Sequence, residues 1–360
     1  MDDVSVNALP TQTLTLSGSP ENGVITATVP GEFSLVFDAD YAWQPCSWYD
    51  LTTDPIQDLA NKGSSSRTKN VLRSPGIASV MGQWLSIDLA QNASIQVVEN
   101  SPARAVLLST LPELSEVVTT TVYPDGSVFL SSLARNETGG PVTFDWFKSP
   151  VVNVEDTLAW YEGDDPQGHF FGFQRTSGAQ PYPNLVVTNA AEDASIGSFG
   201  PGNRYWYLPG RTLQAGEVFT RQCALHPKPN GAPPELAQAY ADDYRYPGLV
   251  IITGTVVGDG YAESEGAYTV AAVDGQAAFY PTDEYLRHAP AFVIGNWPAE
   301  TFVIRKGGVE IASGAAPNRP WTNAFYDAAR QRLVFQYLPD IEPDVPTEQR
   351  TFEVTVDGGG

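Results

Sequence analysis

His169 has the neighbours that most suggest catalytic chemistry in this chain. It follows Asp164 and Asp165, and it precedes three phenylalanines and Arg175. An imidazole can be neutral or charged near pH 7, so it can take or give a proton. We predict His169 as a general base or acid and Arg175 as a ligand for an anionic substrate. The alternative is a histidine packed in an aromatic core or at the end of a hairpin.

The segment Asn203–Leu208 could supply a second part of such a site. Successive side chains of a strand point to opposite faces, so Tyr205 and Tyr207 would share one face and Arg204 the other. Tyrosine can transfer protons and stack on sugar rings, and arginine binds carboxylates. We predict Tyr205 or Tyr207 as catalytic and Arg204 as substrate-binding. Plain core packing is the alternative.

Further candidates for binding lie elsewhere in the chain. Trp48 and Tyr49 belong to the aromatic and polar segment Trp43–Asp54, which could line a pocket or plug the end of a sandwich. Arg67 stands in a short basic segment of a chain with few cations, and such a segment either binds a carboxylate or sulfate or is simply solvated. Tyr182 stands between two prolines in an expected loop.

Acidic residues offer two other kinds of site. Glu162, Asp164 and Asp165 could hold Ca²⁺ through carboxylate oxygens, although their spacing is not that of an EF-hand. Ca²⁺ is the one cofactor to which the sequence points. A glycoside hydrolase needs two carboxylates that bracket one bond, and Glu162 with Asp165 is a candidate pair.

Composition limits the partners and the location. The 360 residues include 42 acidic and 20 basic ones, a formal net charge of −22, so nucleic acid and anionic lipid would be repelled. No run of about 20 apolar residues exists, so we expect no membrane insertion. Met1-Asp2-Asp3 looks like a start before a mature sequence, and we expect a secreted or periplasmic protein. The two cysteines, Cys46 and Cys223, exclude a zinc site built on several thiolates and leave one disulfide open.

Strands must position most of these residues. Runs of β-branched and aromatic residues recur at short intervals, separated by turn signals such as Pro124-Asp125-Gly126. This density of strands, without helical periodicity between them, predicts an all-β sandwich. The strands expected in the first part are Thr13–Leu16, Val24–Val29, Phe33–Phe37, Ser94–Val98, Ala105–Ser109, Val117–Val122, Ser127–Leu133, Val142–Phe147, Leu185–Thr188, Arg204–Leu208 and Glu217–Ala224.

The proline-rich segment His226–Ala237 interrupts this pattern, and a short helix is expected over Pro234–Asp243. We therefore predict a large β domain at 1–225, a linker with the helix at 226–243, and a smaller β-sandwich at 244–360. The strands expected in the smaller domain are Gly248–Val257, Ala267–Val273, Ala277–Tyr280, Ala291–Ile294, Thr301–Ile304, Leu333–Tyr337 and Thr351–Val356.

Two segments resemble a known fold. Tyr123-Pro124-Asp125-Gly126 followed by Arg135-Asn136-Glu137-Thr138-Gly139 resembles the returning hairpin of supersandwich domains, the galactose-mutarotase-like fold. Tyr207–Glu217 resembles the late strands of such domains. The resemblance covers roughly residues 10–225 and implies a large antiparallel β-supersandwich, found in mutarotases, polysaccharide lyases and noncatalytic domains of glycosidases.

The resemblance bears on activity as well. Such a mutarotase uses two histidines and a glutamate, and this chain departs from that pattern because no matching motif surrounds His169 or His226. Lyases of such folds use Tyr or His for proton transfer and Arg, Asn or a cation against the uronate carboxylate. The resemblance thus implies a secreted polysaccharide lyase that cleaves a uronate-containing glycan by β-elimination. A glycoside hydrolase with a carboxylate pair and a noncatalytic glycan-binding or surface protein remain the alternatives.

Overall fold

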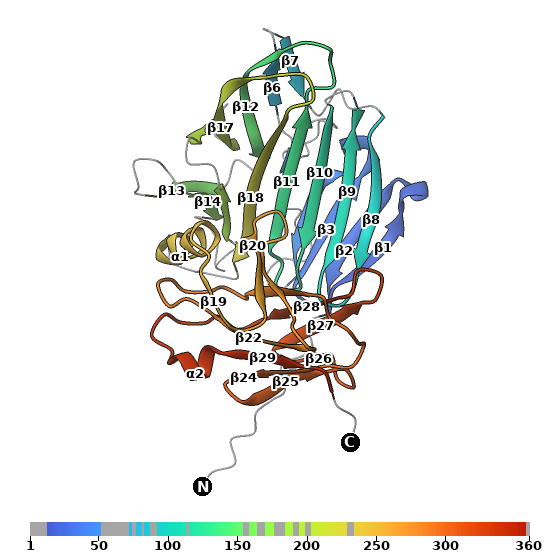
Figure 1. Cartoon of the computed structure of the whole chain (residues 1–360). Coiled ribbons are helices and arrows are strands. Elements are labelled where there is room, and N and C mark those ends of the chain that lie inside the picture. Colours follow the sequence, from blue (N-terminus) through green and yellow to red (C-terminus); the bar gives the residue numbers. More distant parts are fainter. Residues whose placement is uncertain are drawn as a thin grey trace.

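The structure is a computed structural model that describes residues 13–51, 72–73, 77–80, 83–86, 92–112, 115–153, 158–163, 170–175, 184–189, 194–198, 203–228 and 234–357. Their regular secondary structure is mainly β-strand, arranged in several largely antiparallel sheets (Figure 1). The predicted all-β sandwich class is confirmed. No helix within the described residues is both long and apolar enough to span a bilayer.

An eight-stranded sheet forms the main layer of the first part of the chain, which we call the N-terminal unit (β1–β18). Its strand order is β13-β14-β15-β18-β11-β10-β9-β8, and every neighbouring pair is antiparallel. The strands are β8 (Ser94–Asn100), β9 (Ala105–Leu111), β10 (Glu116–Val122), β11 (Val128–Arg135), β13 (Leu158–Glu162), β14 (Phe170–Arg175), β15 (Asn184–Asn189) and β18 (Val218–Lys228).

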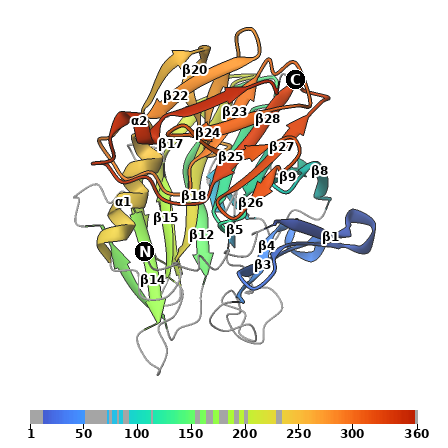
Figure 2. The same ribbon diagram turned by 90° about the horizontal axis from the view of Figure 1, so that it is seen from below.

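Two smaller sheets complete this unit. The first has the order β1-β2-β3-β4, and the second has the order β16-β17-β12-β6-β7 with β5 paired to β12. Figure 2 shows β1–β4 on the opposite side of the molecule from α1. The strands are β1 (Thr15–Ser19), β2 (Val24–Val29), β3 (Phe33–Asp38), β4 (Gln44–Asp50), β5 (Leu72–Arg73), β6 (Ile77–Val80), β7 (Gln83–Ser86), β12 (Val142–Asn153), β16 (Ser195–Gly197) and β17 (Asn203–Leu213), with 3₁₀ turns η1 (Pro20–Asn22) and η2 (Ala39–Tyr41).

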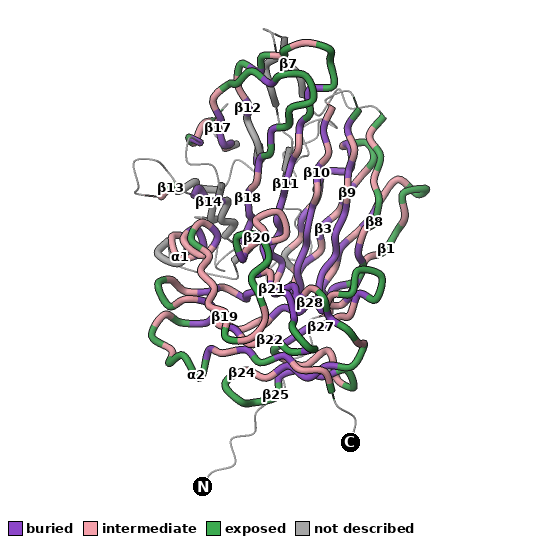
Figure 3. The backbone as a smooth tube through the Cα atoms, viewed as in Figure 1, coloured by how far each residue is buried: buried purple, intermediate pink, exposed green. Residues whose placement is uncertain are grey.

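One apolar core joins these three sheets. It contains alternate residues of β2 and β3, such as Ile25 and Phe37, together with Leu107 of β9, Leu130 of β11 and Trp206 of β17, all at most 1% exposed. Figure 3 shows the buried positions running along the middle strands β9, β10 and β11. The alternation of buried and half-buried residues in β2 and β3 is what a strand with one face on a core requires.

The C-terminal unit (β19–β29) is a second sandwich with its own core. Its sheets have the orders β19-β22-β29-β24-β25 and β20-β21-β23-β28-β27-β26, and β21 pairs with β23 in parallel. The elements are β19 (Leu249–Thr253), β20 (Thr255–Ala262), β21 (Ala267–Ala271), β22 (Gln276–Pro281), β23 (Ala291–Gly295), β24 (Val303–Lys306), β25 (Val309–Ser313), β26 (Asn318–Arg319), β27 (Thr322–Asp327), β28 (Arg332–Tyr337), α2 (Thr347–Arg350) and β29 (Phe352–Thr355).

The connection between the units differs in detail from the expected linker. β18 continues through His226 and Pro227 to Lys228, and these residues pair with β15. The pairing with β11 has already ended at Leu225, so Pro227 lies beyond one of its neighbours, where its missing N–H is tolerated. Helix α1 (Pro234–Arg245) follows and packs Ala237, Tyr240 and Ala241 near Phe170. The domain limits at 225 and 244 stay a prediction.

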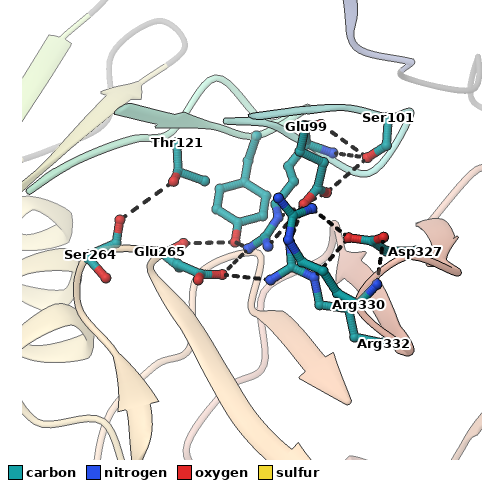
Figure 4. Close-up of polar contacts among 10 residues, drawn as sticks. Glu99, Ser101, Thr121, Ser264, Glu265, Asp327, Arg330 and Arg332 are labelled. Carbon is teal, nitrogen blue, oxygen red and sulfur yellow. Dashed lines mark hydrogen bonds and ion pairs between the residues drawn. The ribbon is translucent and has the colours of Figure 1, made fainter. Parts of the chain in front are cut away.

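A buried ionic network fastens the two units to each other (Figure 4). Arg104, which is completely buried, donates to both carboxylate oxygens of Glu99 at 3.1 and 3.2 Å and to Glu265 of the C-terminal unit at 2.6 Å. Arg332 reaches back from β28 to Glu99 at 2.7 Å. Tyr123 donates its hydroxyl to the Glu265 carbonyl at 2.8 Å. Contacts of this kind restrict motion between the units.

Candidate functional site

Three aromatic side chains gather on the outer face of β12 and β17. Trp206 and Leu208 of β17 point into the core, each 1% exposed, so the alternate residues Tyr205 and Tyr207 lie on the other face. Trp146 of β12 packs with these two tyrosines in a cluster separate from the core. The face assignment predicted from alternation is therefore what the structure has.

Tyr205 is the more enclosed of the two tyrosines. It is 8% exposed, and its ring lies against Gly197 of the neighbouring strand β16, where any side chain would collide with it. Burial, and then the neighbouring Tyr207, raise the pKa of Tyr205 above its ordinary value. A phenol with a raised pKa stays protonated at neutral pH, so it suits the role of proton donor and not that of base.

Arg204 lies on the opposite face of β17 from this aromatic cluster. Its Nε donates to Glu162 Oε1 of β13 at 3.3 Å, and its Nη1 donates to Ser198 at 3.1 Å. The side chains of Arg204 and Glu162 are 21% and 49% exposed. The pair thus ties the edge of the eight-stranded sheet to β17, and the structure does not bring Arg204 beside Tyr205 and Tyr207.

Trp48 and Tyr49 follow each other in β4 and face opposite ways. Trp48 is 5% exposed and belongs to the main core, whereas Tyr49 is half-buried. The position of Trp48 fits the packing alternative and not a pocket wall.

Several predicted site residues lie outside the described part of the chain. These are His169, Arg67, Tyr182, Asp164 and Asp165, and of Arg175 only the backbone in β14 is described. Their roles stay predictions.

A metal or a disulfide has limited support in the described ranges. They contain no group of three or more His, Cys, Asp and Glu side chains that could hold a metal ion. Of the three predicted Ca²⁺ ligands only Glu162 is described, and its carboxylate is paired with Arg204. No disulfide joins Cys46 and Cys223, both of which are described and buried.

Sequence reasoning missed a polar cluster between the two units. Asp125, in the turn between β10 and β11, accepts from Ser127 at 2.5 Å and pairs with His288 Nε2 at 3.2 Å. Ser127 Oγ also lies 3.2 Å from His226 Nδ1. The rings of His226 and His288 are 6.0 Å apart. The Pro-Asp-Gly signal located Asp125 in a turn, but no local signal could bring it to residues 100 and more positions later.

This cluster borders a cavity lined by, among others, Tyr123, His226, Asp243, Tyr268 and His288. The cavity offers a volume of about 20 Å³ to the centres of water molecules, and one water needs roughly 10–15 Å³ when the volume is measured in this way. A sugar ring is far too large for it. The cluster is therefore an internal joint, in contrast to the aromatic face of β12 and β17.

A second buried ion pair lies in the core of the N-terminal unit. Arg221 of β18 pairs with Glu116 of β10 and donates to Ser132 of β11 at 2.7 Å, with its guanidinium 4.6 Å from the Phe147 ring centre. Arg221 and Glu116 are each 4% exposed, so no ligand reaches them and the pair serves packing.

Comparisons with known proteins are weak. The sequence matches no protein-family model and no curated protein. Similar solved structures include carbohydrate-active enzymes at low identity. An α-galactosidase of glycoside hydrolase family 36 from Geobacillus stearothermophilus is 10% identical, with a TM-score of 0.38 over 60% of this chain and 42% of that one. A polysaccharide lyase is 13% identical, with a TM-score of 0.35 over 96% and 46%.

A putative aldose 1-epimerase from Klebsiella pneumoniae is 10% identical, with a TM-score of 0.32 over 64% of this chain and 85% of that one. This chain spans 42% of the α-galactosidase and 46% of the polysaccharide lyase, which is less than half of their length. Identities and TM-scores this low carry no argument about activity, so function has to be argued from the residues themselves.

Proposed function

We propose that this chain acts on a uronate-containing glycan as a polysaccharide lyase and that the sugar stacks on the outer face of β12 and β17. The observation that carries the proposal is the cluster of Trp146, Tyr205 and Tyr207 on one sheet face outside the core. Aromatic rings with a polar end are suited to sugar, because the ring packs on its C–H face while the hydroxyl meets its oxygens.

The chemistry follows from the residue types at this face. In β-elimination a base takes the proton at C5, the electron pair forms a C4–C5 double bond, and the bond from C4 to the leaving oxygen breaks. The leaving oxygen takes up a proton, and Tyr205 is our candidate to give it because its phenol, with a raised pKa, is protonated at neutral pH. Tyr207 and His169 are the candidates for the base, and Arg67 and Arg175 for holding the uronate carboxylate.

The same proposal places the protein outside the cytoplasm, in a secreted or periplasmic setting that suits its charge of −22. Ca²⁺ at Glu162, Asp164 and Asp165 remains the metal to test, and no step of the elimination is routed through it.

The test is incubation with uronate-containing and neutral polysaccharides while ultraviolet absorbance and reducing ends are both followed. A lyase gives an unsaturated product, so absorbance should grow on a uronate polymer. Tyr205→Phe should then lower turnover by roughly 10²–10⁴-fold with little change in binding, which is the size of a lost acid or base. Trp146→Ala should weaken binding up to about tenfold. Tyr326→Phe, a partly buried tyrosine of the C-terminal unit, is the matched control and should change neither.

A noncatalytic glycan-binding protein is the second candidate, favoured by the 8% exposure of Tyr205, which leaves little of its ring open to a reacting sugar. Retention on a glycan without turnover, lost in Trp146→Ala, would establish it in place of the lyase. Reducing ends without absorbance would indicate a hydrolase and move the search to carboxylate pairs. A protein that neither binds nor cleaves any polymer of the panel would contradict both proposals.

A further inference from the structure

His288 is held between two carboxylates that come from different units. Its Nε2 lies 3.2 Å from Asp125 Oδ2 and its Nδ1 lies 2.6 Å from Asp340 Oδ1. Asp125 belongs to the β10–β11 turn of the N-terminal unit, whereas His288 precedes β23 and Asp340 follows β28 in the C-terminal unit. The imidazole ring therefore bridges the two units.

The two contacts fit a doubly protonated ring between two ionised carboxylates. A neutral imidazole has one N–H, and an ionised carboxylate can only accept, so both short contacts are hydrogen bonds only in the imidazolium form. Burial alone would raise the pKa of Asp125, but the hydrogen bond and charge of His288, with bonds from Gln336 and Ser127, hold it well below its usual value. Asp125 is thus ionised over the whole pH range in which the His288 ring carries its charge.

The groups that surround His288 from other elements make a cation suitable here. Its backbone N–H donates to Asp243 Oδ2 of α1 at 2.9 Å, and Asp243 also pairs with Arg287 at 3.2 Å. The ring of Tyr240, also on α1, lies 4.4 Å away. Burial, and then the charges of Asp340, Asp125, Asp243 and Glu342, raise the pKa of that tyrosine.

The remaining neighbours of the ring are an amide and a second imidazole. Gln336 Nε2 donates to Asp125 Oδ1 at 3.0 Å and to the Ala289 carbonyl at 3.0 Å. His226 faces His288 edge-on at 6.0 Å and contacts Ser127. If His288 lost a proton, Asp125 and Asp340 would lose the positive charge that they share, while Asp243 would keep its ion pair with Arg287.

We propose that His288 is a pH-operated latch between the units: its imidazolium holds the β10–β11 turn against the C-terminal unit, and loss of one proton releases that turn. In the closed joint, loss of that proton would leave one carboxylate facing a ring lone pair in a half-buried place, which is repulsive, so the deprotonated joint opens. The latch is independent of the proposed glycan chemistry, since it involves none of the aromatic residues of β12 and β17.

The size of the effect follows from linkage. When closing is coupled to one bound proton, the opening equilibrium changes by up to about tenfold per pH unit once the ring in the open state has lost that proton. The pKa of an exposed histidine is about 6.5. Opening of the joint should therefore increase as the pH rises above about 6.5.

Hydrogen exchange of backbone amides between pH 5.5 and 9.0, corrected for the intrinsic exchange rate, would test the latch in the full chain. Peptides covering 123–128 and 285–292 should open increasingly above about pH 6.5, while the β24–β25 hairpin (303–313) should not. His288→Gln should abolish the pH response. His226→Gln is the matched control, because it removes a buried histidine of the same joint whose Nδ1 lies 3.2 Å from the Ser127 hydroxyl, and it should keep the response.

Two results would overturn the latch: a wild-type joint that opens equally at pH 5.5 and 9.0, or a His288→Gln protein with the wild-type slope. If His288→Gln fails to fold, Asp340→Asn replaces it, since an amide can donate to a neutral ring nitrogen. Its slope should be shallower than that of the wild type, and an unchanged slope in Asp340→Asn would equally refute the proposal.

Discussion

Replacing Arg104 by Met should expose how much the ionic network between the units contributes to stability. The guanidinium is completely buried and touches Glu99, Glu265 and Tyr123. Burial would lower the pKa of Arg104, but Tyr123, Glu265 and Glu99 keep it well above its ordinary value, so the group is always charged. Methionine fills a similar volume without charge, so the substitution removes the ion pairs and leaves the packing.

The expected loss of stability depends on which contacts Glu99 and Glu265 keep when Arg104 is replaced. Glu99, whose side chain is 2% exposed, would retain Arg332 at 2.7 Å and Ser101 at 3.3 Å. Glu265 would retain only Arg332 at 3.9 Å, but its side chain is 31% exposed, so water compensates in part. Removing one partner of a buried pair typically costs 3–5 kcal/mol, and these compensations favour the lower end, about 3 kcal/mol.

Arg319→Met is the matched control. Arg319 donates to Glu310 at 2.9 Å, but the side chains of that pair are 40% and 39% exposed, so about 0–1 kcal/mol is expected. Both variants change the net charge by the same amount, which removes the overall repulsion of an acidic chain from the comparison. Urea unfolding, followed by tryptophan fluorescence and circular dichroism together, gives the free energies and shows whether the two units unfold as one.

An Arg104→Met protein that loses less than about 1 kcal/mol, like Arg319→Met, would refute the reasoning. The buried network would then contribute no more than a surface pair. A loss of about 3 kcal/mol with the two probes still coincident would show that the network couples the units in unfolding.

The remaining predictions concern acid and one glycine. Burial favours the neutral form of Glu265, but Arg104 and Arg332 outweigh burial and lower the pKa of this carboxyl group. His288 lowers the pKa of Asp125 in the same way. Glu265 and Asp125 therefore contribute stability above about pH 4.5, and this stability is lost as the pH falls. Urea midpoints should therefore fall between pH 5 and 3, and a flat profile would contradict this. Gly266→Ala should cost roughly 2 kcal/mol more stability than Gly308→Ala. Both glycines have positive φ, but an added Cβ would meet the Phe129 ring at Gly266 and open space at Gly308. Equal urea unfolding midpoints of the two variants would exclude the clash.

Turns and strand faces were predictable because their causes are local. Pro124-Asp125-Gly126 does reverse the chain: Tyr123 N–H donates to the Ser127 carbonyl at 3.0 Å, and Gly126 has φ of +85°. Val117–Val122 pairs with the strand that follows, as its alternation required. Proline chemistry and a two-residue period act over a few residues, so the sequence alone contains them.

The candidate site was predictable only in part. Alternation separates Tyr205 from Arg204, but both faces of β17 carry large aromatic residues, so the pattern could not say which face meets the core. Packing against Phe171, which comes from β14, decides this in favour of Trp206. The strand β4 was missed for a similar reason, since its mixed composition also suits a pocket and only pairing with β3 fixes it.

The joint was not predictable, because its contacts join residues far apart in the chain. Glu99 meets Arg332 across 233 residues, and Asp125 meets Gln336 across 211. Each side chain taken alone reads as an ordinary surface charge of an acidic protein. Only the folded chain shows that the carboxylates there are paired with cations. The pairing matters because an unpaired charge in the same buried place would be strongly destabilising.

The polar contacts between the units and the aromatic face of β12 and β17 therefore lie in different parts of the molecule for a physical reason. Figure 1 places β12 and β17 in the upper part of the N-terminal unit, and the C-terminal unit below it. The contacts between the units include the buried pair of Arg104 and Glu99 and the cluster around Asp125, whose cavity has room for about one water, so the joint suits rigidity and proton-linked control. The aromatic face has Trp146 and Tyr207 half-buried on a sheet that is firmly packed behind them. A polymer needs a surface that it can reach, so the proposed glycan contact belongs to the half-buried Trp146 and Tyr207, and we infer that the joint serves to hold the fold.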